Sequence, residues 1–307
     1  MIFLIILLIL SILAIIIFYK KKLNQAQIFK KFVSEQFLNR IDTQGIDIRY
    51  GYKEKANLTI LFSDIRSFTS FAEALEPHQL FDILNIYFTA MSECIYDNEG
   101  FIDKFIGDAI MAIFDHNLDT GDSKASAAVW AAIEMQKRLD KFNKEIKNII
   151  NIPIKTGIGI HSGEVMMGTI GFERRMDSAI LGDNVNIASR IESLTKELHC
   201  KIIISETTLA QMTDKDTFQY RPLGPVRVKG REKLLNLYEV YNCDSDELRG
   251  LKQQTKSYFE RGLEYFAREE WDKGEQEFKN ALKIYPNDYS AKYILDTNLN
   301  QHEWRQL

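Results

Sequence analysis

The sequence has little cysteine and no concentration of positive charge. Its three cysteines, Cys94, Cys200 and Cys243, lie far apart. Without a paired spacing they exclude a cysteine zinc site or a dithiol redox site, and we expect reduced packing residues in a cytosolic compartment. The formal net charge is −4, and no basic stretch stands out, which argues against nucleic acid as a partner.

The N-terminus also lacks the features of a cleaved signal peptide. No basic residue precedes the apolar run Ile2–Tyr19, and no small-residue cleavage site follows it. At about 1.5 Å per residue the run crosses most of a bilayer core of roughly 30 Å. Three lysines follow at 20–22, and basic residues stay on the cytoplasmic side. We therefore predict one transmembrane helix over residues 1–19 in the inner (cytoplasmic) membrane, with the remaining chain in the cytoplasm.

Residues 20–56 are expected to form a juxtamembrane helix and a linker. Apolar residues form one stripe on the helix, at Phe29, Val33, Phe37 and Ile41. This stripe packs either on the chain's own globular domain or on the same helix of a second protomer, and the pattern favours neither.

The stretch FIDKFIGDAIMAIF, Phe101–Phe114, predicts two strands joined by a tight turn at Gly107-Asp108. A Gly-Asp turn with Lys104 nearby is, taken alone, typical of any protein surface. A second stretch, LTILFSDIRSFT, changes this interpretation because its apolar strand ends in Asp64. Two carboxylates at two strand ends can share hard cations such as Mg²⁺.

A third stretch, GDNVNIASRIE, predicts a strand end that leads into a helix from about Asn184. Asn186 and Arg190 are four residues apart, so they share one helix face and can address one ligand together. The alternative is a solvated helix on which the pair is incidental.

These three stretches, in this order and with these separations, resemble the class III nucleotidyl cyclases, and among them the membrane-bound bacterial adenylate cyclases. The resemblance covers about Asn57 to Tyr241. It implies an α+β, ferredoxin-like catalytic domain at residues 57–243, and a homodimer with two sites at its interface.

The resemblance also implies roles for individual residues. Asp64 and Asp108 would hold two metal ions per site, Mg²⁺ or Mn²⁺, with the carbonyl of Ile65 as a further ligand. Asn186 would orient the ribose and Arg190 would stabilise the pentavalent transition state. In this family the aspartates come from one protomer, and the Lys, Asn and Arg from the other.

Further residues would bind the nucleotide. Arg174 and Lys229 match positions that contact the terminal phosphates. Backbone amides around Phe68 and Thr69 would lie within reach of a phosphate. Lys104 favours ATP, because guanylate cyclases carry an acidic residue there. Ala179 departs from the Asp or Thr that is usual in adenylate cyclases and that accepts a bond from the adenine amino group.

A second hairpin is predicted from Ile154–His161 and Glu164–Ile170, with its turn at Ser162-Gly163. His161 is tempting as an acid or base. A histidine at such a strand end is more often a structural hydrogen-bonding group, and we assign it that role.

Residues 250–307 are helical and polar, and Phe259–Pro286 resembles one tetratricopeptide repeat, with a third helix over about Tyr289–Leu299 as its cap. A simple helical hairpin that stabilises the C-terminus is an equal alternative. A lone repeat buries too little to stand alone. It should pack on the cyclase domain, on its twin in the dimer, or on a protein partner.

The sequence therefore predicts an adenylate cyclase. Two alternatives are a guanylate cyclase and a catalytically silent, membrane-tethered scaffold. A diguanylate cyclase is disfavoured because no GG(D/E)EF turn occurs. No sensor domain is recognisable, so the activating signal is not indicated.

Overall fold

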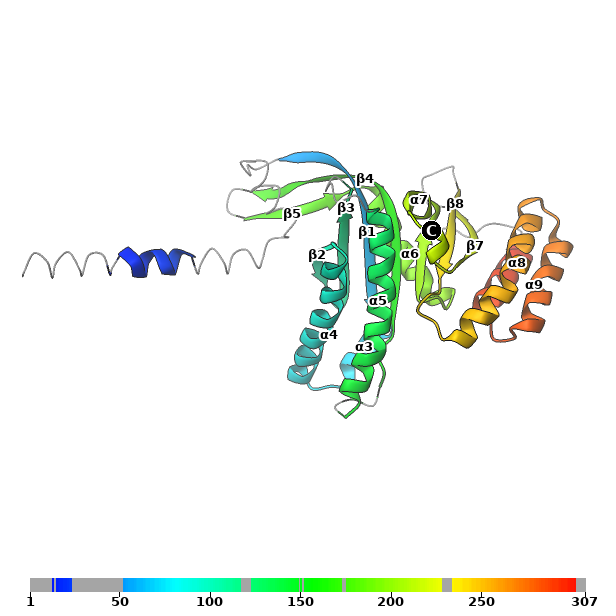
Figure 1. The fold of residues 1–307 in the computed structure, drawn as a ribbon, viewed down its shortest axis with the longest axis horizontal. Coiled ribbons are helices and arrows are strands. Elements are labelled where there is room, and N and C mark those ends of the chain that lie inside the picture. Colours follow the sequence, from blue (N-terminus) through cyan, green and yellow to red (C-terminus); the bar gives the residue numbers. More distant parts are fainter. Residues whose placement is uncertain are drawn as a thin grey trace, which may run out of the picture. The chain divides into compact units, whose positions relative to one another are not determined.

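The structure is a computed structural model that describes residues 13, 15–23, 52–116, 123–148, 150, 152–172, 175–227 and 234–301 (Figure 1). The chain divides into two compact units, Met1–Lys53 with Gly168–Ala179, and Glu54–Met167 with Ile180–Leu307. The predicted transmembrane and juxtamembrane helices lie largely outside the described residues. Within the described part of the chain, no helix is both long and apolar enough to span a membrane.

Eight strands and the helices around them make up most of the described fold. The strands are β1 (Lys53–Ile65), β2 (Phe101–Ile106), β3 (Ala109–Asp115), β4 (Thr156–Phe172), β5 (Arg175–Leu181), β6 (Ile202–Ser205), β7 (Tyr220–Arg227) and β8 (Leu234–Val240). The α-helices are α3 (Phe68–Glu73), α4 (Pro77–Asp97), α5 (Lys124–Glu145), α6 (Asp183–Glu197), α7 (Glu206–Gln211), α8 (Asp246–Ala267), α9 (Trp271–Ile284) and α10 (Tyr289–Gln301).

The sheet is mixed, with the order β2-β3-β1-β4-β6-β8-β7, and β5 pairs with β4. β1 runs antiparallel to β3, whereas β4 runs parallel to β6. This is the predicted α+β class. The predicted β2-β3 hairpin is also present, and Gly107 in its turn has a φ of +65°, which glycine adopts without strain.

Helices α4 and α5 lie side by side on one face of the sheet (Figure 1). Pro77 opens α4 at a position where a missing N–H costs nothing, and the Ser123 side chain caps α5 by accepting from the N–H of Ser126. Along β6 the side chains alternate as a strand requires. Ile202 and Ile204 join the cluster under α4 and α5, while Ile203 joins a cluster on the opposite face.

The predicted hairpin around Ser162-Gly163 is wrong, because β4 is one continuous strand from Thr156 to Phe172. Three of its glycines, Gly157, Gly159 and Gly163, mark close approach of α6 rather than a turn. A Cβ on Gly159 would lie 2.1 Å from the backbone nitrogen of Glu192, and one on Gly163 would lie 2.4 Å from Nδ2 of Asn184. Glycine thus allows α6 to lie directly against the strand.

Helices α8, α9 and α10 pack on the face of the sheet that also carries α6. Their apolar residues form one cluster with α6, β6, β7 and β8, which includes Ile191, Ile203, Leu237, Phe259, Phe278 and Ile294. Two glycines, Gly262 on α8 and Gly274 on α9, permit the close contact of these two helices. A Cβ on Gly262 would meet the ring of Phe278 at 2.7 Å, and one on Gly274 would meet Phe266 at 2.3 Å. The sequence predicted that these helices pack on the cyclase domain, on their twin in a dimer or on a protein partner. In the structure they pack on the sheet and α6 of their own chain.

The described part of the smaller unit includes the end of β4 and most of β5. The N–H of Thr169 donates to the carbonyl of Tyr52 at 2.9 Å. Gly168 permits this approach, because a Cβ there would lie 2.1 Å from the same carbonyl oxygen. Ile170 and Phe172 expose about half of their surface, at 49% and 59%.

Candidate active site

Asp64 and Asp108 meet where β1 ends and the β2-β3 turn begins. Asp64 acts on the Asp108 carboxyl both as a side-chain hydrogen-bonding group and as a neighbouring negative charge. Burial, and then this bond and charge, raise the pKa of Asp108 to about 7. Two carboxylates held this close repel each other when both are ionised, so the pair favours either a shared proton or a bound cation.

The donors around this pair fit a hard divalent cation. The N–H groups of Ile65 and of Asp108 itself donate to the Asp108 carboxylate. Its Oδ2 is buried and has no hydrogen-bond partner among the described residues. An orphaned carboxylate oxygen beside a second carboxylate is suited to Mg²⁺ or Mn²⁺. Among the described residues, no three or more His, Cys, Asp or Glu side chains are placed so that together they could hold a metal ion, so backbone carbonyls such as that of Ile65 would complete the donor set.

Lys104 lies exposed on β2 and pairs with the carboxylate of Asp103, at 3.3 Å from Nζ to Oδ2. The Asp103 side chain is only 2% exposed, and its burial raises its pKa although Lys104 lowers it. The pairing register shifts between Ile102 and Lys104. Sequence reasoning missed Asp103, because a β-bulge leaves no reliable signal in a single sequence.

Asn186 and Arg190 are both exposed on α6, while Ile187 and Ile191 point into the core. The start of the helix is fixed by Asn184, whose Oδ1 lies 3.1 Å from Nε2 of His161 and whose Nδ2 donates to the carbonyl of Glu164 at 2.7 Å. His161 is only 2% exposed, and its predicted structural role is confirmed.

Two further charged residues, Arg66 and Glu192, belong to this region and were not predicted. Nη2 of Arg66 donates to the carbonyl of Thr195 in the last turn of α6, at 3.0 Å, and to the carbonyl of Cys200 in the connection to β6. Burial, and then the charge of Asp64, raise the pKa of Glu192 to about 7. Their positions in the sequence could have identified them, because Arg66 follows Asp64 by two residues and Glu192 follows Arg190 by two.

The other predicted residues are distributed as follows. Phe68 and Thr69 begin the short helix α3 directly after the β1 strand end, with Phe68 packed against the core. Ala179 is half-buried on β5 and belongs to the smaller unit. Arg174 and Lys229 lie outside the described residues.

Comparisons with known proteins agree with this arrangement. A family model described as adenylate and guanylate cyclase catalytic domain matches residues 51–242. An adenylate cyclase of Anabaena cylindrica is 45% identical over 218 residues, which are 69% of this chain and 42% of that protein. The terminal-differentiation specific adenylate cyclase of Dictyostelium discoideum is 37% identical over 273 residues, 88% of this chain and 13% of that protein.

Among solved structures, the adenylyl cyclase CyaB from P. aeruginosa is 35% identical, with a TM-score of 0.55, covering 62% of this chain and 95% of that chain. This chain spans less than half the length of the two sequence relatives. The Dictyostelium match is too long to end at residue 242, so it continues into the C-terminal helices. With most of its length matched by the family model, the chain belongs to the adenylate and guanylate cyclase catalytic-domain family.

Proposed function

We propose that this chain is an adenylate cyclase that converts ATP into 3′,5′-cyclic AMP and pyrophosphate. The observation that carries the proposal is the Asp64–Asp108 pair, with its unpartnered buried oxygen, inside a domain of the cyclase family. The names of the two sequence relatives support ATP as the substrate. The reaction forms a bond between the ribose 3′-oxygen and the α-phosphorus and breaks the bond from the α-phosphorus to the oxygen that leaves with pyrophosphate. It needs no covalent enzyme intermediate.

The aspartates form the metal half of the site. Asp64, Asp108 and the carbonyl of Ile65 would hold two divalent cations, Mg²⁺ or Mn²⁺, which supply activation of the hydroxyl and neutralisation of phosphate charge. The backbone N–H groups that donate to Asp108 keep its carboxylate fixed, so that part of the geometry exists before substrate binds.

The α6 half of the site acts on the nucleotide. Asn186 orients the ribose, and the permanently charged, planar guanidinium of Arg190 stabilises the charge on the α-phosphoryl group. Arg174 and Lys229 bind the terminal phosphates. Asn186 and Arg190 face outward from α6, which suits a site shared with a second protomer.

A two-fold homodimer would form two such sites. Phe105 and Ile106, at the end of β2, expose about half of their surface, at 47% and 51%. On the smaller unit, Ile170 and Phe172 do the same. Adjacent exposed apolar side chains can contribute to a surface that binds another protein, and in the proposed homodimer this partner is a second copy of the chain.

The direct test is cyclic nucleotide production by the full-length protein with ATP or GTP, and with Mg²⁺ or Mn²⁺. Cyclic AMP from ATP is the expected main product. Faster turnover of GTP would instead identify a guanylate cyclase. A folded, dimeric protein that turns over neither nucleotide would support the silent scaffold.

The shared site has its own test. Asp64→Ala and Arg190→Ala should each be inactive as homodimers. Their heterodimer keeps one site without a lesion and should recover about half of the wild-type activity. No recovery in a purified heterodimer would contradict the shared site.

Substrate selectivity depends on Lys104 and Ala179. Lys104 can donate to adenine N1, whereas alanine at 179 cannot accept from the adenine amino group. A missing bond at a base edge is worth about 1–3 kcal/mol, so the preference for ATP should be narrower than threonine would give. Ala179→Thr should raise kcat/KM for ATP more than for GTP, and an equal effect on both would contradict adenine recognition at this position.

The apolar run Ile2–Tyr19 would anchor the protein in the inner membrane by one helix, with Lys20–Lys22 and the catalytic domain in the cytoplasm. Alkaline extraction and proteolysis of inverted vesicles test this, and release of the intact protein by alkali would contradict it.

The C-terminal helices would offer a repeat-like surface to a protein partner, and their helical hairpin with close glycine contacts supports that proposal.

A further inference from the structure

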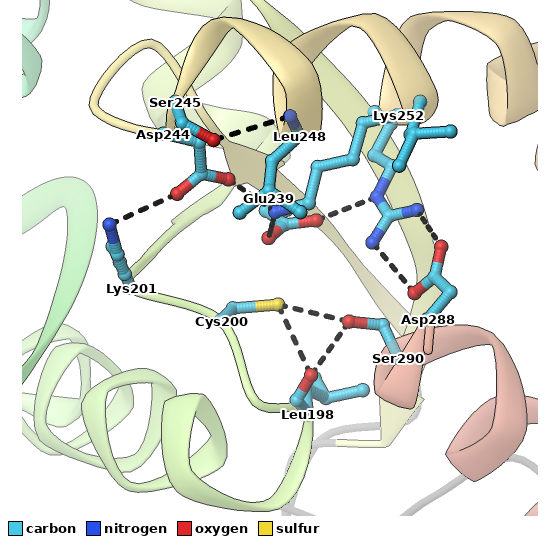
Figure 2. Close-up of polar contacts among 12 residues, drawn as sticks. Leu198, Cys200, Lys201, Glu239, Asp244, Ser245, Leu248, Lys252, Asp288 and Ser290 are labelled. Carbon is cyan, nitrogen blue, oxygen red and sulfur yellow. Dashed lines mark hydrogen bonds and ion pairs between the residues drawn. The ribbon is translucent and has the colours of Figure 1, made fainter. Parts of the chain in front are cut away.

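The first residues of α10 contact the end of α6. We name the connection Leu198–Cys200 the α6–β6 turn. The hydroxyl of Ser290 donates to the carbonyl of Leu198 at 2.6 Å (Figure 2). One helical turn further on, the hydroxyl of Tyr293 donates to Oε2 of Glu197 at 2.6 Å. The C-terminal helices therefore supply hydrogen bonds to both sides of the point where α6 ends.

Buried charges hold the start of α10 in place. Oδ1 of Asp288 accepts from the N–H of Ala291 at 3.2 Å, which caps α10, and from Nη2 of Arg221 at 3.0 Å. Nε of Arg221 in turn donates to Glu239 at 2.6 Å. Glu239 also accepts from Lys252 of α8 at 2.6 Å (Figure 2). The side chains of Arg221, Glu239 and Asp288 are at most 2% exposed. Ser290 is thus presented to the α6–β6 turn by a rigid support.

The same turn is held from the catalytic side. Arg66, next to Ile65, donates to the carbonyls of Thr195 and Cys200. Helix α6 cannot move closer to the sheet, because its backbone already meets β4 at Gly159. What sets the position of α6 along its axis is therefore the contacts at its two ends.

We infer that the C-terminal helices position α6 for catalysis, and that Ser290, through the α6–β6 turn, and Tyr293, through Glu197, act on the placement of Asn186 and Arg190. This inference rests on the proposed function, in which those two side chains address the nucleotide. Ser290 and Tyr293 are positioning residues, since their hydroxyls contact Leu198 and Glu197 at the end of α6 and not Asn186 or Arg190. The C-terminal helices then contribute to turnover as well as to stability.

The first experiment compares hydroxyl deletions in the full-length protein. Ser290→Ala removes the donor to Leu198, and we expect kcat to fall about three- to tenfold, with KM for ATP changed less than about twofold. Ser290→Thr keeps a hydroxyl and should restore most of kcat. The matched control is Thr255→Ala, which removes a buried hydroxyl that bonds to the carbonyl of Leu251 within α8. Its kcat should stay within about twofold of wild type.

The second experiment separates positioning from loss of stability. In the heterodimer of Asp64→Ala and Arg190→Ala chains, the intact site uses α6 of the Asp64→Ala chain. Ser290→Ala placed on that chain should lower activity by the same factor as above. Placed on the Arg190→Ala chain, whose α6 is already inactive, it should have no effect.

The outcomes are distinct. Equal loss from both placements, or equal loss in Ser290→Ala and Thr255→Ala homodimers, would show a merely structural role and overturn the inference. If the heterodimer without Ser290→Ala were itself inactive, the shared site would be wrong, and the inference would fall with it. If Ser290→Ala kept wild-type kcat, the inference would be wrong while the proposed function stood.

Discussion

The described residues include two clusters of carboxylates that differ in their partners. In the catalytic pair, Asp108 adjoins Asp64, and burial together with this like charge raises the pKa of Asp108 to about 7. In the second cluster, Glu239 lies between Arg221 and Lys252. Burial alone would raise the pKa of Glu239, but the two cations outweigh it and lower the pKa to about 2. Burial acts to raise the pKa of half-buried Asp108 and of fully buried Glu239 alike, so the neighbouring charges decide the direction of the net shift.

We name the second cluster the charge network, and its described members alternate in sign: Asp288, Arg221, Glu239, Lys252, Asp244 and Lys201. Each of its carboxylates accepts from at least one cation. The catalytic pair instead leaves one oxygen of Asp108 unpartnered. The comparison indicates that the network stabilises the fold, whereas the pair is kept unsatisfied for a ligand.

The largest expected effect is on turnover. Asp64→Ala and Asp108→Ala should each abolish cyclase activity, by about 10³-fold or more, because each removes a metal ligand worth several kcal/mol in the barrier. Thermal unfolding should show no loss of stability, since each variant also removes one of two repelling charges. Retained activity in either variant would show that the residue is not an essential metal ligand. Unfolding of either variant would show that the pair stabilises the fold, as the charge network does.

The network should respond in the opposite way. Arg221→Met leaves Asp288 buried without its cation, and should lower the free energy of unfolding by about 3–5 kcal/mol. Urea denaturation followed by circular dichroism measures this. Combining it with Asp288→Asn should cost less than the sum of the two single variants, because the two residues are partners. Strict additivity would show that the ion pair is not coupled.

Acid provides a test without mutation. The pKa of Glu239 is about 2 in the folded state, against an ordinary value of 4.5. A carboxylate with a depressed pKa stabilises the fold above its unfolded value, and loses this contribution as the pH falls through the folded one. The stability supplied by Glu239 should therefore be complete above about pH 4.5 and decline toward pH 2. Glu239→Gln should flatten this part of the profile, and an unchanged slope would contradict the assignment.

An exposed ion pair between α8 and α9 should have the smallest effect on the free energy of unfolding. Arg261 on α8 bonds to Glu277 on α9 at 2.8 Å, and the Arg261 side chain is 45% exposed. Water screens such a pair, so Arg261→Ala should change the free energy of unfolding by at most about 1 kcal/mol. A loss as large as that of Arg221→Met would mean that burial does not distinguish the network.

The parts of the site that the sequence predicted are those carried by local patterns. Asp64 and Asp108 each terminate or interrupt an apolar strand run, and Asn186 and Arg190 are placed on one face by helical spacing alone. Such signals need only a few neighbouring residues. For this reason the β2-β3 hairpin, the end of β1 and the start of α6 agree with the structure.

The parts that could not be predicted depend on distant residues. Ser162-Gly163 has the composition of a turn, and only the position of Asn184, packed against Gly163, shows that the glycine serves a straight strand. Arg221 and Asp288 are separated by 67 positions, and each resembles a surface charge in its own segment. Pairing of this kind leaves no trace in the periodicity of either segment.

The apolar cluster beneath α8–α10 has a consequence for where this protein can be divided. The family match ends at residue 242, yet the cluster that begins with Ile187 of α6 continues to Ile294 of α10 without interruption. The catalytic domain of this family and the cooperatively folding unit therefore have different boundaries in this chain. Because the C-terminal helices and the sheet bury the same side chains, they should melt in one transition, and the domain that the family model covers is smaller than the unit that unfolds cooperatively.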